Sequence, residues 1–202
     1  MEKNRLEAFT DGVMAIIITI MVLELKVPHS AEFAALAGIW PIFLSYVLSF
    51  LYVGIYWNAH HHLFQTSRHV SGAVLWANLH LLFWLSLMPF TTGWMGENHF
   101  ARLPVAVFGL NLLLAAIAYL ILQTTLVRLQ GPHGVLAQAI GQDWKGKVST
   151  AMYPLGIALA LWVAPWVGFA VFWVPALMWI VPDRRMESIV SRPQDRDTQR
   201  RN

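Results

Sequence analysis

Long stretches without a charged side chain constrain the fold of this sequence more than any other feature. No Asp, Glu, Lys or Arg occurs in residues 33–67, 103–127 or 148–182, and Glu97 is the only one in residues 69–99. Charged residues make up 12% of the chain, whereas a soluble domain carries about 25%. There is no cysteine. These features exclude a soluble enzyme, a disordered chain and a disulfide-stapled secreted domain, and they predict an all-α integral membrane protein.

The apolar stretches are long enough for six transmembrane helices, because a helix needs about 20 apolar residues to cross the bilayer. The last stretch, residues 148–182, is too long for one helix and contains a turn signal at Ala164-Pro165. The two short halves also fit an interfacial hairpin. The expected helices lie at about residues 5–27, 34–63, 70–94, 104–129, 147–164 and 166–182. Residues 1–182 are expected to form one transmembrane domain, followed by a polar cytoplasmic tail at 183–202.

The basic residues predict the orientation of these helices. With six crossings, all of the 14 Lys and Arg residues except Lys26 and Arg102 fall on the side of the N-terminus. Cytoplasmic segments of membrane proteins carry the excess of Lys and Arg. We therefore expect both termini in the cytoplasm of a multi-pass protein of the cell membrane, inner or plasma.

The first helix carries ionisable groups where the bilayer begins. Asp11 is the deepest, and a carboxylate inside the membrane costs about 2.5–3.5 kcal/mol on insertion scales. Arg5 is the nearest basic residue, but a separation of six positions does not place two residues on one helix face. A cation from another helix or from a neighbouring subunit is an alternative partner. The pattern leaves two interpretations open, an anchor at the cytoplasmic helix end or a role at a pore entrance or in assembly.

Further along the same helix, four residues share one face. Ile16, Thr19, Ile20 and Leu23 follow helical spacing. Taken alone, this spacing is typical of a lipid-facing or packed stripe in which the Thr hydroxyl bonds back to a backbone carbonyl.

Three adjacent histidines, His60, His61 and His62, suggest a metal site, but their spacing argues against one. Consecutive helical residues point in different directions, whereas a zinc-binding helix uses pairs at i and i+4. We therefore expect no metal. Hydrogen bonds between helices are the favoured role for these histidines and for Asn78 in the next helix. The lack of titratable groups in the outer halves of these helices argues against a proton relay.

Several motifs together resemble the transmembrane protein 175 family, which contains the endolysosomal potassium channel and bacterial homologues. Thr10 stands where the family usually has Ser, and Met14 where an aromatic residue is common. The resemblance covers about residues 5–92. It is carried by Arg5-x-x-x-Phe9-Thr10-Asp11-Gly12, Ala15-Ile16, Val22-Leu23-Glu24-Leu25, Trp57-Asn58-x-His60-His61-x-Leu63-Phe64, Leu75-Trp76-x-Asn78-Leu79 and Leu87-Met88-Pro89-Phe90.

The resemblance implies a potassium channel fold that lacks the usual carbonyl filter, and a leak-type, potassium-permeable pore. Because the signature occurs once, it implies a homotetramer with the four first helices lining the pore. Ile16 would form the aliphatic constriction, Thr19 a hydroxyl layer, and Ile20 and Leu23 the rest of the pore face. Rubidium and cesium are expected to pass as well, since an apolar ring admits the ions that lose water most easily. No cofactor and no nucleic-acid partner are implied.

The same resemblance implies a structural network that holds the first helix. Its expected members are Arg5, Phe9, Thr10, Asp11, His60, His61 and Asn78. Which histidine takes part is left open. Three alternatives to a channel stay open. They are a secondary transporter, with or without proton coupling, a membrane enzyme that uses the histidines, and an assembly subunit. The transporter is disfavoured because no inverted repeat or pair of broken helices is evident, and the enzyme because acids and nucleophiles are scarce.

Overall fold

The computed structural model describes residues 2–65, 67, 69–131, 136 and 144–180, and every regular element in these residues is a helix. The prediction of an all-α protein is confirmed. The tail at 183–202 and the end of the sixth expected helix lie outside the described residues. The helices are α1 (Lys3–Leu23), α2 (Phe33–Gly38), α3 (Trp40–Gln65), α4 (Gly72–Ser86), α5 (Met88–Glu97), α6 (Arg102–Gln130), α8 (Trp144–Trp162) and α9 (Pro165–Ile180).

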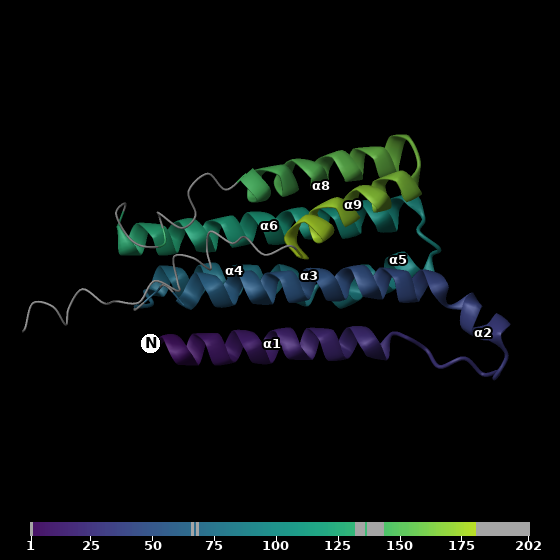
Figure 1. Cartoon of the computed structure of the whole chain (residues 1–202), viewed down its shortest axis with the longest axis horizontal. Coiled ribbons are helices and arrows are strands. Elements are labelled where there is room, and N and C mark those ends of the chain that lie inside the picture. Colours follow the sequence, from purple (N-terminus) through teal and green to yellow (C-terminus); the bar gives the residue numbers. More distant parts are fainter. Residues whose placement is uncertain (1, 66, 68, 132–135, 137–143, 181–202) are drawn as a thin grey trace, which may run out of the picture.

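Four helical units of the described chain are long and apolar enough to cross a membrane: α1, α3, α4 together with α5, and α6. Helices keep all backbone hydrogen bonds within the segment, as the bilayer interior demands. Helix α9 is apolar and has 16 residues in the described part of the chain, which ends at Ile180. Figure 1 shows α8 and α9 lying along α6 rather than across its end. Six crossings with both termini in the cytoplasm stay a prediction.

Two of the expected helices are each divided in two. The expected helix at 34–63 is split at Ile39 into α2 and α3, and the one at 70–94 is split at Leu87 into α4 and α5. A proline stands in the first turn after each break, Pro41 and Pro89. Proline lacks the N–H that would continue the preceding helix but is tolerated in the first turn of a new one.

The helices form a layered bundle with α1 on one side and the pair α8 and α9 on the other (Figure 1). Helix α3 contacts α1, α5 and α9, while α6 contacts α4, α5, α8 and α9. Helix α1 rests on α3, α4 and α5. Since the central helices have neighbours on several sides, the core lies between α3 and α6.

Phe172 of α9 lies at a point of close packing between three helices. Its side chain is fully buried, and it lies against Gly109 of α6 and Gly156 of α8. A Cβ atom added to either glycine would collide with the Phe172 ring. Small residues at these two positions therefore let three helices approach each other closely, as is common where helices meet in membranes.

The first helix and its anchoring network

One face of α1 is fixed to the bundle and the opposite face is uncovered. Leu6, Thr10, Met14, Ile17 and Met21 are buried, with spacings of three and four residues. This spacing places them on one stripe, directed at the neighbouring helices. The other faces of α1 have no covering helix in the single subunit.

A chain of three buried side chains fastens the N-terminal half of α1. The Asn78 amide Nδ2 donates to the Thr10 hydroxyl at 2.9 Å, and His60 Nε2 donates to Asn78 Oδ1 at 3.0 Å. The three residues come from α1, α4 and α3, and each is at most 2% exposed. Because the amide oxygen can only accept, the His60 ring carries its proton on Nε2. The His60 ring also stacks on Phe64, with the ring centroids 4.4 Å apart.

A second contact holds α1 beside this chain. The indole Nε1 of Trp57 donates to Asp11 Oδ1 at 3.0 Å. The Trp57 ring stacks on His61, with ring centroids 5.9 Å apart, and Gln65 Nε2 donates to His61 Nε2 at 2.7 Å. Asp11 is exposed and flanks the buried Thr10. Its carboxylate thus has an uncharged donor from α3.

The structure therefore brings some of the expected network together and leaves other members apart. Thr10, His60 and Asn78 are in direct contact, and His61 reaches Asp11 only through Trp57. Arg5 and Phe9 are exposed, and Arg5 makes no ion pair within the described part of the chain. Trp57 was not expected in the network. Its presence next to the histidines in the quoted motif was the available signal.

The stripe of four expected pore residues points away from the subunit. Ile16 is 59% exposed and Leu23 is 74% exposed, and Ile20 and Thr19 are exposed between them. Thr19 Oγ1 donates its proton to the Ala15 carbonyl oxygen at 2.8 Å. With the proton engaged there, the oxygen lone pairs are left for an outside partner. Such an oxygen suits a cation better than an anion.

The segment that follows α1 is tied to the end of α5 by an ion pair. Lys26 Nζ, in the segment after α1, lies 2.7 Å from Glu97 Oε1 at the end of α5. The hydrogen bond to Glu97, with the attraction of its negative charge, raises the pKa of Lys26. Both side chains are exposed, and an exposed pair of this kind contributes little to stability.

No group of three or more His, Cys, Asp or Glu residues with the geometry of a metal site occurs among residues 2–65, 67, 69–131, 136 and 144–180. Two of the three adjacent histidines make hydrogen bonds to other side chains: His60 bonds to Asn78, and His61 bonds to Gln65.

The fold and the anchored first helix define a multi-pass helical membrane protein with one apolar, hydroxyl-bearing helix face left uncovered. The family model described as endosomal/lysosomal potassium channel TMEM175 matches residues 5–89. A relative from Chryseobacterium sp. (strain P1-3), named a potassium channel, is 54% identical over 187 residues, which cover 93% of this chain and 97% of the relative. The chain therefore belongs to the TMEM175 family.

Two further relatives extend the comparison. The crystal structure described as a lysosomal potassium-selective channel TMEM175 homologue from Chamaesiphon minutus matches with a TM-score of 0.77 and 27% identity, covering 88% of this chain and 96% of that one. The human protein named endosomal/lysosomal proton channel TMEM175 is 34% identical over 116 residues, which cover 52% of this chain and 23% of the human protein. The family and these relatives are named as ion channels, a class distinct from enzymes.

Proposed function

We propose that this chain is one subunit of a homotetrameric, leak-type channel permeable to potassium, with the four α1 helices lining the pore. The observation that carries the proposal is the orientation of α1: its packed face is fastened by the Thr10–Asn78–His60 chain, and the opposite stripe is uncovered. A stripe held outwards by a directional network is what a pore helix needs. The names of the bacterial relatives support potassium as the permeant ion.

In this proposal Ile16 forms the constriction and Thr19 lies about 4.5 Å further along the axis, at 1.5 Å per residue. Ile20 and Leu23 continue the apolar wall outwards. Apolar side chains cannot replace the water around an ion, so they favour ions that are weakly hydrated. Four Thr19 oxygens would supply part of a replacement shell. We expect preference for potassium over sodium, with rubidium and cesium also permeant, in a cell membrane with both chain termini in the cytoplasm.

The test is potassium flux into liposomes that contain only the purified protein. Flux above that of empty liposomes, driven by the potassium gradient without a second, coupled solute, is the expected result. A secondary transporter would instead show flux that depends on a second, coupled solute. Equal flux with and without protein, in several lipid compositions, would remove the channel proposal.

The pore assignment has its own test. Ile16→Asn is expected to raise conductance or weaken selectivity, because it places a polar group at the constriction. Ile121→Asn is the matched control, since Ile121 is exposed on α6, away from the proposed pore. Thr19→Ala and Leu23→Ala complete the set. Unchanged currents in Ile16→Asn, Thr19→Ala and Leu23→Ala would mean that the pore lies elsewhere.

The human relative is named a proton channel, so proton flux is the informative second readout. The stripe from Ile16 to Leu23 contains no titratable side chain, which supports potassium over protons in this chain. A pH-sensitive dye inside the same liposomes distinguishes the two ions.

A further inference from the structure

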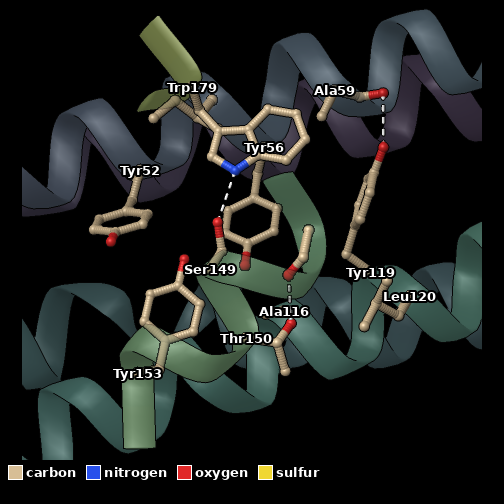
Figure 2. A pocket seen from close by; sticks show the side chains of 12 residues that line it. Tyr52, Tyr56, Ala59, Ala116, Tyr119, Leu120, Ser149, Thr150, Tyr153 and Trp179 are labelled. Carbon is tan, nitrogen blue, oxygen red and sulfur yellow. Dashed lines mark hydrogen bonds between the residues drawn. The ribbon is translucent and has the colours of Figure 1, made fainter. Parts of the chain in front are cut away.

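A small, partly open cavity lies between α3, α6, α8 and α9, with a volume of about 50 Å³. Tyrosines from three helices form much of its wall: Tyr52 and Tyr56 from α3, Tyr119 from α6 and Tyr153 from α8 (Figure 2). No residue of α1 lines it. The cavity is therefore separate from the proposed pore.

Some polar groups in the wall of the cavity have hydrogen-bond partners among the described residues, and one does not. Tyr52 donates to the Phe172 carbonyl oxygen at 2.6 Å, and Trp179 Nε1 donates to Ser149 Oγ at 3.0 Å. The Tyr56 hydroxyl makes no hydrogen bond to any described residue, although the side chain is only 7% exposed. Figure 2 shows the Tyr56 ring below the Trp179 indole, with its oxygen directed towards α8. This phenol is a free donor at the wall of the cavity.

An unpaired hydroxyl in an apolar interior is unfavourable unless it finds an acceptor. The cavity size limits what that acceptor can be. A water needs about 10–15 Å³ and a cavity of about 150 Å³ can hold benzene, so 50 Å³ lies between them. We propose that the cavity binds a short-chain primary alcohol of two or three carbons. The alcohol oxygen accepts the Tyr56 hydrogen bond, and the alkyl chain lies against Ile55, Ala116 and Leu120, which also line the cavity.

The cavity shares its α3 wall with the anchor of α1. Tyr56 and Ala59 line the cavity, and the residues that follow them, Trp57 and His60, bond to Asp11 and Asn78. An occupant that displaces this turn of α3 thus acts on the donors that position α1. The effect of the alcohol on ion flux rests on the proposed channel function, whereas its binding does not.

Binding is tested by saturation-transfer NMR with ethanol and 1-propanol on the purified full chain in deuterated detergent, with empty micelles as blank. We expect a saturable signal for the wild type, binding about fivefold weaker in Tyr56→Phe, which loses one hydrogen bond, and none in Ala116→Leu, which fills the cavity. Tyr46→Phe is the matched control, because Tyr46 is on α3 but does not line the cavity. A signal no greater than that of empty micelles, or one equal in all four proteins, would overturn the proposal.

The link to conduction is tested with potassium flux in liposomes across the series from ethanol to 1-octanol, at equal concentrations in the bilayer. A cavity of limited volume predicts that the effect ends beyond about three carbons and is reduced in Tyr56→Phe. An effect that grows steadily to 1-octanol and is the same in Tyr56→Phe would assign it to the bilayer and refute the link. If no liposome shows flux, the channel proposal fails, and the NMR result still decides the binding site.

Discussion

Helices α1 and α6 are both apolar enough to cross a membrane, but they are held in the subunit by different means. Half of the apolar stretch of α6 is buried (50%), against 28% of that of α1. Helix α6 is fixed by close packing, with Gly109 against Phe172. Helix α1 packs a single buried stripe, and polar bonds from Thr10 and Asp11 to side chains of α3 and α4 add to that packing. Lipid is as apolar as leucine, so burial alone drives helix association weakly in a membrane, and packing and hydrogen bonds decide it.

This difference indicates how a helix can be oriented while one face stays free. Packing on all sides fixes the position of a helix, but it leaves no face of that helix uncovered. Two directional contacts on one edge fix the rotation of α1 and leave the Ile16–Leu23 stripe uncovered. The comparison predicts that damage to the α6 region unfolds the subunit, whereas damage to the α1 anchors releases one helix.

The largest effect is expected from Phe172→Ala. The ring is fully buried between α6, α8 and α9, and its removal leaves a cavity at a cost of about 3 kcal/mol in the free energy of unfolding. Denaturation of the purified subunit in mixed micelles measures it. Phe90→Ala is the control, since Phe90 is 64% exposed and its loss should cost less than about 0.5 kcal/mol. Equal losses in the two variants would show that α6 and its neighbours are not held by packing at this point.

Asn78→Leu is expected to have the next largest effect, about 2 kcal/mol, because it leaves both Thr10 and His60 without a partner in a buried site. The loss should appear as a reduced fraction of assembled oligomer in cross-linking or native mass measurements, with α8 and α9 still folded. Asn98→Leu serves as comparison, since the Asn98 amide bonds only to the Trp94 carbonyl of its own helix turn. An assembled fraction equal to the wild type would contradict the anchoring role of Asn78.

Trp57→Phe removes one hydrogen bond to Asp11 while keeping an aromatic ring against His61. A loss of about 1 kcal/mol in subunit stability is expected. Trp76→Phe makes the same change at a side chain that is 75% exposed and should be neutral. If Trp57→Phe is as stable as the wild type, the Thr10–Asn78 hydrogen bond is the polar contact that anchors α1, and the Trp57–Asp11 bond contributes nothing measurable.

The smallest effect on stability is expected on the uncovered face. Ile16→Ala should change the unfolding free energy of the isolated subunit by less than about 0.5 kcal/mol, because no neighbour in the subunit covers the side chain. Its effect on potassium flux should nevertheless be large if α1 lines the pore. Strong destabilisation of the isolated subunit without a change in flux would contradict this assignment. It would mean that the Ile16 face of α1 packs in the fold and does not line a pore.

Much of the fold could be predicted because the membrane imposes simple rules on sequence. The long apolar stretches located α1, α3, α4 with α5, and α6, and the Ala164-Pro165 signal fell where α8 gives way to α9. The breaks at Ile39 and Leu87 were missed. Each lies inside a continuous apolar stretch, and hydropathy does not register where a proline interrupts the backbone hydrogen bonds.

The site was harder to predict than the fold. For Asp11 the sequence suggested a cation from another helix or a neighbouring subunit as one partner, whereas within the described chain its carboxylate accepts from the neutral indole of Trp57. A cation from a neighbouring subunit stays a prediction. His60 and His61 are equivalent as sequence, and only the rotation of α3 makes His60 face Asn78. The tyrosines of the cavity come from three helices at unrelated positions. Their meeting is a result of tertiary packing that no local pattern records.

The lengths of α3 and α6 bear on the thickness of membrane that the protein prefers. At 1.5 Å per residue, α3 and α6, with 26 and 29 residues, span about 40 Å. A typical hydrocarbon core is about 30 Å thick. Helices longer than the hydrocarbon core adapt by tilting or by thickening the bilayer around them, at a cost of a fraction of a kcal/mol per Å. Helices α3 and α6 are therefore expected to change their tilt with bilayer thickness, so that lipid composition acts on the two central helices of the bundle.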